Sequence, residues 1–365
     1  MRVLALSSVA MLALGCAAAS NGGVTRTYYV AADEVVWDYA PSDSNQIVGR
    51  GWEGFDREVM IPGADRIGHK YKKAIYREYT DSTFTTLKPR PPEWEHLGIL
   101  GPLLRAVVGD TLRVVFKNNG THPYTMHPHG VFYNKDSEGA PYADGSAGAD
   151  KEDDGVQPGK THVYVWPVPE RAGPAHGEGS SVQWMYHSHN VEDSDLNAGL
   201  IGPILVTAQG MAKPDGSPQD VDREFVVAFA ELDENLSWYL QDNINSYALD
   251  KKKFPRIGDF TDLYYVSNLR ETMNGLSFGH LKGLTMKQGQ HVRWYLFGTT
   301  GFEIHAPHWH GNTVVANHMR TDVTNLMTMQ MVTADMVPDN PGIWLFHCHV
   351  GPHLLAGMAA LYRVE

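Results

Sequence analysis

One stretch organises the sequence, and it runs His347-Cys348-His349-Val350-Gly351-Pro352-His353-Leu354-Leu355-Ala356-Gly357-Met358. Cys348 offers a thiolate, His353 follows five positions later and Met358 ten positions later. This is the ligand set of a blue-copper electron-transfer site, in which two His and one Cys bind the metal and a Met is a weak axial ligand. A buried structural Cys among surface His is the competing interpretation, but it does not explain the spacing. The pattern therefore predicts a mononuclear copper site that needs one more His.

The two His that flank Cys348 indicate a second metal centre. In an extended strand, residues i−1 and i+1 point to the opposite face from residue i. If Cys348 binds the first metal, His347 and His349 reach through the sheet toward another one. The strand would join the two metal sites through a single covalent link.

Composition limits the class of protein. A length of 365 residues suggests two or three domains. The formal net charge of −12 argues against nucleic acid as a partner, because such a partner requires a basic surface. The two cysteines are Cys16 and Cys348, so a mature chain without its N-terminal segment has no internal disulfide. Metal ligation gives a reason for keeping a single Cys.

The N-terminal segment predicts export. Met1-Arg2 is followed by an apolar run over residues 3–14, which is too short to be a permanent membrane span. Ala17 and Ala19 fit a signal-peptidase site, whereas Gly15-Cys16 fits a lipoprotein site followed by a tether, and both interpretations stay open. Residues 1–23 are therefore expected to be a signal peptide or tether, and the mature protein to be periplasmic, extracellular or lipid-anchored.

A recurring pattern predicts two homologous domains. Residues 105–116 consist of two apolar runs around Gly109-Asp110, which is the pattern of a β-hairpin, and residues 287–297 repeat it. Short strands without strong helical periodicity predict an all-β chain of two antiparallel sandwiches. A linker rich in Gly, Pro and Asp separates them, so the expected parts are residues 24–208, 209–222 and 223–365.

Histidine pairs occupy matching positions in the two repeats. Within a strand, His at i and i+2 project from the same face, so each pair can bind one centre. Eight imidazoles suit a cluster of three coppers, and His305 is left over for the mononuclear site. Structural zinc is the chemical rival, but it would require one closed set of four ligands. The pairs are His127/His129, His187/His189, His308/His310 and His347/His349.

Longer motifs carry a family resemblance over residues 70–365. The motifs are Tyr79-Thr-Asp-Ser-Thr-Phe84, His96-Leu-Gly-Ile-Leu-Gly-Pro102, Glu138-Gly139-Ala140, Tyr186-His-Ser-His189, Gly199-Leu-Ile-Gly-Pro203 and Pro341-Gly-Ile-Trp-Leu-Phe-His-Cys-His-Val350. The sequence resembles the multicopper oxidases, specifically the ceruloplasmin and hephaestin branch. The resemblance implies two cupredoxin-like Greek-key sandwiches, in the two-domain form of small laccases. The first domain has Ser188, Asp193 and Ala198 where the second has Cys348, His353 and Met358, so the blue copper is expected in the second domain only.

The resemblance also implies roles for the ligands of four copper ions. His305, Cys348, His353 and Met358 would hold the type 1 copper, and His127 and His308 the type 2 copper. The type 3 pair would be held by His129, His187, His189, His310, His347 and His349. Dioxygen would be reduced to water at the cluster. Glu138 is the expected proton relay, and a solvated loop acid is its alternative.

Two further features follow from the resemblance. A homotrimer is expected, because each domain holds two His pairs and three chains of two domains match the six-domain ring of the family. A calcium ion is expected on the backbone carbonyl of Lys135 and the carboxylates of Asp150, Asp153 and Asp154. A solvated acidic turn is the alternative for these residues.

The sequence leaves more than one reducing substrate open. The family's iron-binding positions correspond here to Val266, Glu271 and Pro352, two of which offer no suitable ligand. We therefore expect a laccase-like oxidase of phenols or small reductants, with ferroxidase as the alternative. The alternating methionines 327, 329 and 331 suggest cuprous-ion oxidation or, more commonly, core packing.

Other classes fit the sequence less well. A copper nitrite reductase would have its blue site in the first domain. The blood-clotting relatives keep the fold but lose the coppers, whereas every ligand is present here. Copper storage would not require a Cys-linked path between sites.

Overall fold

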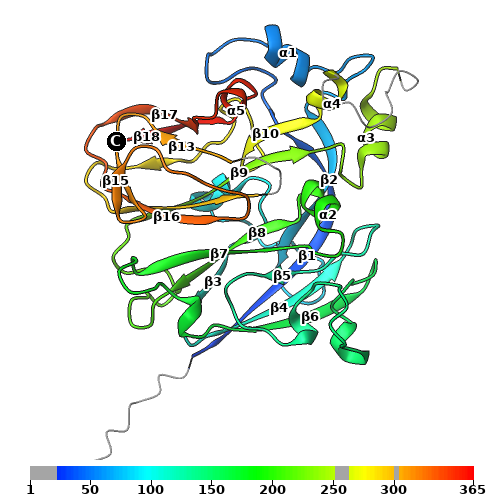
Figure 1. The fold of residues 1–365 in the computed structure, drawn as a ribbon, viewed down its shortest axis with the longest axis vertical. Helices are drawn as coiled ribbons and strands as arrows, with labels where there is room; N and C mark the ends of the chain where they lie inside the picture. Colours follow the sequence, from blue (N-terminus) through cyan, green and yellow to red (C-terminus); the bar gives the residue numbers. More distant parts are fainter. Residues whose placement is uncertain (1–22, 251–262, 300–303) are drawn as a thin grey trace, which may run out of the picture.

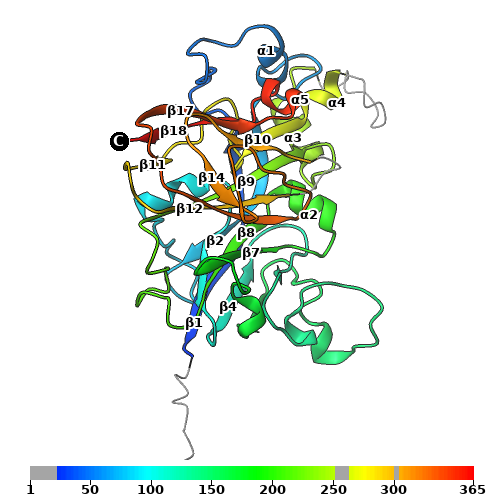
Figure 2. The same ribbon diagram turned by 60° about the vertical axis from the view of Figure 1, so that its left-hand side comes forward.

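The computed structural model describes residues 23–250, 263–299 and 304–365, which form two stacked β-rich halves (Figure 1). Turning the molecule shows the same two layers from the side (Figure 2). The strands of the first half are β1 (Thr25–Asp38), β2 (Lys70–Tyr79), β3 (Leu104–Val107), β4 (Thr111–Asn118), β5 (His127–Pro128), β6 (Thr161–Pro167), β7 (Ser181–His187) and β8 (Ile201–Thr207). The strands of the second half are β9 (Arg223–Asp233), β10 (Leu269–Met273), β11 (Thr285–Met286), β12 (Val292–Gly298), β13 (Pro307–Trp309), β14 (Val314–Ala316), β15 (Met319–Thr321), β16 (Met331–Met336), β17 (Gly342–Cys348) and β18 (Ala359–Val364).

Helices are short and lie in the connections. The α-helices are α1 (Gly54–Met60), α2 (Glu192–Ala198), α3 (Leu240–Tyr247), α4 (Leu263–Ser267) and α5 (Gly351–Leu355). The 3₁₀ turns are η1 (Pro92–Leu97), η2 (Lys135–Ser137), η3 (Gly148–Lys151) and η4 (Glu170–Ala172). Among the described residues, no helix has the length and apolar character that crossing a membrane requires.

The two halves repeat one sheet topology. In the first half, one sheet has the order β2-β1-β4-β6 and the other β3-β8-β7-β5. The second half has β10-β9-β12-β16, extended by β14 and β15, and β11-β18-β17-β13. The first strand of each half lies parallel to its partner, β1 to β4 and β9 to β12. The prediction of an all-β chain of two sandwiches is confirmed, but the sheets are mixed rather than antiparallel, because β1/β4, β3/β8, β9/β12 and β11/β18 pair in parallel.

Each sandwich has its own core, built from side chains that alternate toward the inside of the strands. In the first, Trp166 and Tyr186 are fully buried. In the second, the indole of Trp294 lies against Phe346, with ring centroids 5.0 Å apart, and Cys348 belongs to the same cluster. The blue-site Cys is therefore part of the core of the second sandwich.

A third apolar core lies between the halves. It combines residues of the first half, such as Met185 and Leu205, with Val226 and Phe297 of the second. The segment 39–69, which includes α1, leaves the first half and packs on the second (Figure 1). Arg105 pairs with Glu224 across this boundary at 2.9 Å. Burial of apolar area on this scale favours one fixed arrangement of the halves.

The predicted hairpin at residues 105–116 is wrong. β3 pairs with β8 and β4 with β1 and β6, so the two strands belong to different sheets. Gly109 has a φ of 100°, and the Asp110 carboxylate accepts hydrogen bonds from the Val107 N–H at 2.9 Å and from Arg26 Nε at 2.6 Å. The turn therefore connects strands of two different sheets. The sequence pattern misleads because a Gly-Asp pair is also typical of hairpin turns.

The proposed domain bounds are residues 24–208 and 223–365, with 209–222 as the linker. Residues 210–216 lie in turns between β8 and β9, which is compatible with that role. The expected signal peptide or tether covers residues 1–23, and residues 1–22 lie outside the described part of the chain.

Candidate metal centres

The first group of candidate ligands surrounds Cys348. Its Sγ lies 3.4 Å from His353 Nδ1 and 4.0 Å from His305 Nδ1, and the two Nδ1 atoms are 3.2 Å apart. All three side chains are buried. The Ala306 N–H points at the sulfur from 3.3 Å, which stabilises negative charge on it. The site can hold a thiolate and two imidazoles around one ion.

Three structural elements assemble this group. Cys348 ends β17, His353 lies on α5, and His305 is held beside Leu326 by backbone hydrogen bonds. Met358 is fully buried in the same core, and its carbonyl accepts a hydrogen bond from the Cys348 N–H at 3.1 Å. Burial lowers the pKa of His305 to about 4, and the neighbouring His353 ring makes a smaller contribution in the same direction. The imidazole is therefore neutral at ordinary pH, as a metal ligand must be.

The second group lies on the other face of β17. His347 Nε2 is 3.1 Å from both His308 Nδ1 and His310 Nε2. His349 completes a tetrad with these three residues, and neighbouring ring centroids are 4.6 to 5.5 Å apart. Cys348 thus faces one group while its two sequence neighbours face another.

The third group is the equivalent tetrad of the first half. His127 and His129 come from β5 and its end, and His187 and His189 from the end of β7. Ring centroids are 5.2 to 5.5 Å apart, and His129 Nε2 lies 3.1 Å from His187 Nε2. Burial, together with the His127 and His189 rings, lowers the pKa of His129 to about 4.

Backbone carbonyls orient several of these imidazoles. The Nδ1 of His127, His187 and His347 lies 2.7, 3.1 and 2.8 Å from the carbonyl oxygens of Glu138, Ser188 and Cys348, respectively. An Nδ1–H that donates to a carbonyl leaves Nε2 as the metal-binding nitrogen. The sequence does not show this device, because any residue supplies a carbonyl.

The donor sets fit copper. Two nitrogens that bind one ion at about 2.0 Å lie roughly 3 Å apart, close to the 3.1 Å between His310 and His347. A thiolate and a thioether beside imidazoles select copper over harder cations. In the first half Ser188 replaces the thiolate, and its hydroxyl donates to Asp195 at 2.6 Å. That position offers a hydrogen bond and no soft ligand.

The two tetrads belong to separate groups. Across residues 23–250, 263–299 and 304–365, the groups of three or more ligand atoms within 4.8 Å of one another are His127/His129/His187, His308/His310/His347 and His305/Cys348/His353. No ring contact among those residues joins one tetrad to the other. His310 and His349 are exposed. Each tetrad would supply half of the ligands of the predicted three-copper cluster, and each has ring surface open to solvent.

The structure changes the interpretation of Glu138. Its carboxylate accepts hydrogen bonds from Lys135 Nζ at 2.5 Å and from the Tyr142 hydroxyl at 2.9 Å. Its carbonyl, as described above, orients His127. The carboxylate is held by a cation, and the carbonyl gives this residue a positioning role toward His127.

The expected calcium ligands are only partly gathered. Asp153 is fully buried; one carboxylate oxygen accepts the Gly139 N–H at 2.6 Å, and the other has no hydrogen-bond partner among the described residues. Burial raises the pKa of this carboxyl group. Asp154 pairs with Lys151 at 2.9 Å, and Asp150 is exposed. The described part of the chain does not bring the three carboxylates within 4.8 Å of one another.

Comparisons with known proteins agree with this geometry. Two family models, each described as "Multicopper oxidase", match residues 97–210 and 255–365. The chain belongs to the multicopper oxidase family. Among curated relatives it is similar to ferroxidase HEPHL1 from Homo sapiens (44% identical, covering 94% of this chain and 30% of the relative) and to human ceruloplasmin (39%, covering 93% and 30%). The chain spans about three-tenths of the length of these relatives.

Solved structures share the fold. The structure of a multicopper oxidase called mgLAC matches with a TM-score of 0.61 at 19% identity, covering 93% of this chain and 86% of that one. Another multicopper oxidase matches with a TM-score of 0.57 at 19% identity, covering 94% and 89%. At such identities the likeness supports the cupredoxin-like sandwich fold alone.

Proposed function

We propose that the chain is a copper-dependent oxidase that takes electrons one at a time from ferrous iron and uses them to reduce dioxygen to water. The observation that supports this most directly is the position of Cys348. Its sulfur faces His305 and His353, while the neighbouring His347 belongs to the tetrad on the other face of β17. A redox metal on one side is then linked by covalent bonds to metals on the other.

The residues of the chain would bind the copper ions and orient the imidazoles. His305, Cys348, His353 and Met358 would hold the type 1 copper, and the eight tetrad His the type 2 and type 3 coppers. Bound copper supplies the one-electron redox chemistry that the side chains lack. The buried core around Cys348 excludes water from the thiolate, and the carbonyls of Glu138, Ser188 and Cys348 fix the imidazole tautomers.

The choice of ferrous iron rests on the relatives and on one feature of the sheet. The human relatives are named ferroxidase HEPHL1, hephaestin and ceruloplasmin. Glu271 of β10 lies directly opposite Glu231 of β9. Glu231 shares a strand face with Phe229, whose ring centroid is 6.0 Å from that of His305. Carboxylates suit a hard divalent cation, and this pair would place it beside the type 1 ligands.

Neutralising these carboxylates is expected to change iron oxidation selectively. Replacement of Glu231 and Glu271 by Gln should lower kcat/KM for ferrous iron by at least about tenfold, because it removes the two negative charges that would bind the cation. Oxidation of a phenol should change little. Steady-state oxygen consumption with each substrate measures both. Equal losses for iron and phenol would contradict an iron-specific role.

Phenol oxidation is the second candidate, as the sequence favours it. Its structural support is a cavity of 510 Å³ beside the type 1 group. Leu354 and Leu355, which follow His353, line it together with Phe55 and Phe278. A cavity of this size accommodates an aromatic ring, and Arg50, Glu53 and Asp56 add charged groups to its lining. The same oxygen-consumption assay decides between the candidates, with the larger kcat/KM identifying the substrate.

The cuprous-ion hypothesis has less support. Met329 and Met331 pack against the core between the halves, which is the packing role expected of methionines at alternate positions. Met327 is 58% exposed. The three thioethers therefore occupy different environments.

Calcium binding remains a proposal that now depends on Asp153. The buried carboxylate oxygen of Asp153 that lacks a hydrogen-bond partner among the described residues would bind the calcium ion. Calcium should therefore raise the unfolding midpoint of the copper-loaded protein. Replacement of Asp153 by Asn should abolish that rise, while Asp150→Asn, at an exposed position, serves as the matched control. Thermal unfolding with calcium or a copper-sparing chelator makes the measurement. A midpoint insensitive to calcium would support the acidic turn instead.

We also propose export and a homotrimer. Export rests on the apolar run at residues 3–14. The trimer rests on the two open tetrads, since closed cyclic symmetry would place the tetrad of one chain against the other tetrad of its neighbour. Its test is given in the Discussion.

A further inference from the structure

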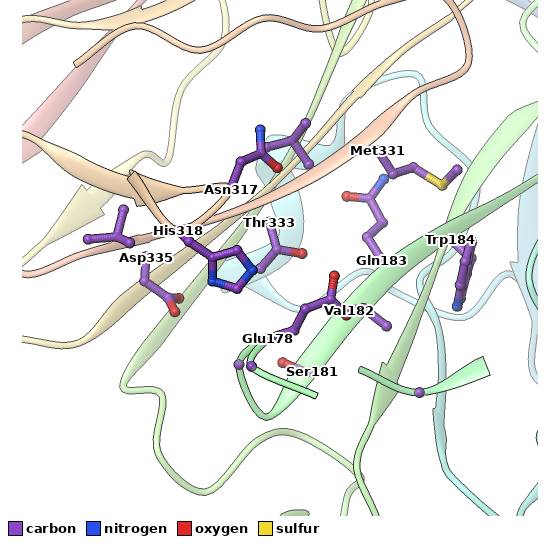
Figure 3. A pocket seen from close by; sticks show the side chains of 15 residues that line it. Glu178, Ser181, Val182, Gln183, Trp184, Asn317, His318, Met331, Thr333 and Asp335 are labelled. Carbon is purple, nitrogen blue, oxygen red and sulfur yellow. The ribbon is translucent and has the colours of Figure 1, made fainter. Parts of the chain in front are cut away.

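A cavity of 350 Å³ lies between the two halves, where β7 faces β16 (Figure 3). Its lining comes from β7, from the loop that precedes it, and from β14, β16 and the β14–β15 turn. None of the described type 1, type 2 or type 3 candidate ligands lines it. The cavity is therefore distinct from the proposed copper centres.

Gln183 enters this cavity with an unpaired amide. The residue is 3% exposed, and neither its Nε2 nor its Oε1 has a hydrogen-bond partner among the described residues. It shares a strand face with Ser181, whose hydroxyl lies 2.7 Å from the Tyr295 hydroxyl across the boundary. Burying an amide without partners is costly, so native proteins normally satisfy both ends. Something that offers one acceptor and one donor would remove this cost.

The rest of the lining limits the charge of a ligand. Asp335 is neutralised by Arg293, with contacts of 2.7 and 3.0 Å. Glu178 is exposed, and one of its oxygens accepts the Ala175 N–H, so a negative charge remains available near the mouth. Figure 3 shows the Glu178 carboxylate and the His318 ring directed toward the space that Gln183 enters. An anionic ligand would meet repulsion there.

Apolar groups complete the walls. Met331 of β16 and Val315 of β14 line the cavity, while their strand neighbours Val332 and Val314 point into the core of the second half. Trp184 borders the cavity from the other face of β7, because neighbouring residues of a strand alternate, and its ring packs on the core of the first half. His318 is fixed by the tight turn between β14 and β15, where its φ is 62°.

We propose that this cavity binds a small neutral or cationic molecule that carries an amide-type edge, a carbonyl acceptor beside an N–H donor. The edge pairs with the Gln183 amide, an apolar or aromatic body lies against Met331 and Val315, and a positive group is directed toward Glu178. The proposal is independent of the identity of the reducing substrate.

Four probes test the proposal by isothermal titration calorimetry with the full-length, copper-loaded protein. 4-(Aminomethyl)benzamide carries the amide edge and a cation, and benzamide carries the edge alone. Methyl benzoate lacks the N–H donor, and benzoate is an anion. We expect 4-(aminomethyl)benzamide to bind most tightly, benzamide less tightly, and the other two at least about tenfold more weakly than benzamide.

Two variants assign the contacts. Gln183→Met keeps the side-chain size, and it should weaken benzamide binding at least about tenfold while leaving blue colour and oxidase activity unchanged. Glu178→Gln changes an exposed residue, and it should reduce 4-(aminomethyl)benzamide to the affinity of benzamide without altering benzamide itself. Binding of none of the probes, equal binding of benzoate, or unchanged binding by Gln183→Met would each overturn the proposal and leave a cavity filled by water only. If Gln183→Met does not fold, the Glu178→Gln variant decides. Its binding 4-(aminomethyl)benzamide with the wild-type affinity would overturn the proposal.

Discussion

Replacement of Cys348 by Ser is expected to remove the blue colour and to reduce oxidase activity to background. Cys348 is the described cysteine, and its sulfur is the soft ligand between His305 and His353. A serine hydroxyl is a hard, weakly acidic donor that cannot supply thiolate-to-copper charge transfer. The tetrads do not use this side chain, so three of the four coppers should stay bound. Visible absorption, copper content and oxygen consumption are the measurements.

A matched control is available in the other half. Ser188 occupies the equivalent position, where its hydroxyl donates to Asp195. Ser188→Ala removes that hydrogen bond and the one that the Ser188 Oγ accepts from the buried Thr125 N–H at 3.0 Å, but it does not touch the type 1 group. The blue colour should therefore persist, with a loss of stability of about 2 kcal/mol. Retained blue absorption in Cys348→Ser would refute the type 1 assignment.

The second large effect is expected from mixing two inactive variants. One carries His129→Ala with His187→Ala, which destroys the first-half tetrad, and the other carries His310→Ala with His347→Ala, which destroys the second-half tetrad. Each should be inactive alone, because the cluster needs both tetrads. Co-expressed in one trimer, an intact first half of one chain can meet an intact second half of another. Random assembly should then restore about a quarter of wild-type activity.

The outcome discriminates between two arrangements of the cluster. If each chain builds its own cluster, no mixture of the two variants regains activity. Co-expression of two differently tagged copies of one variant gives the background oxidase activity. Light scattering on the wild-type protein shows whether the assembly has the mass of three chains.

The sequence predicts the elements that depend on local alternation. Cys348 and its neighbours lie on opposite faces of β17 because side chains alternate along any strand. The two homologous sandwiches were predictable because the His-rich motifs recur in the same order. The hairpin at residues 105–116 was not, because strand partners are chosen by long-range packing rather than by the turn. Long-range packing also decides that residues 39–69 lie against the second half, which the local sequence does not reveal.

Backbone contacts at the candidate site could not be predicted from the sequence. The family resemblance implies that the Glu138 carboxylate relays protons to the cluster, which stays a prediction, and the structure adds that Lys135 and Tyr142 donate hydrogen bonds to that carboxylate. The Glu138 carbonyl orients His127. Carbonyl contacts depend on backbone position, which residue type does not reveal. The unpaired amide of Gln183 is equally invisible in sequence, because its environment is formed by the meeting of the two halves.

The most direct test of the central claim is the ratio of ferrous ions oxidised to dioxygen consumed by the copper-loaded protein, measured together with hydrogen peroxide. A type 1 copper linked through Cys348 to a three-copper cluster predicts about four ferrous ions per dioxygen and no peroxide. A ratio of about two with peroxide released, or oxidation that proceeds equally in Cys348→Ser, would contradict the account.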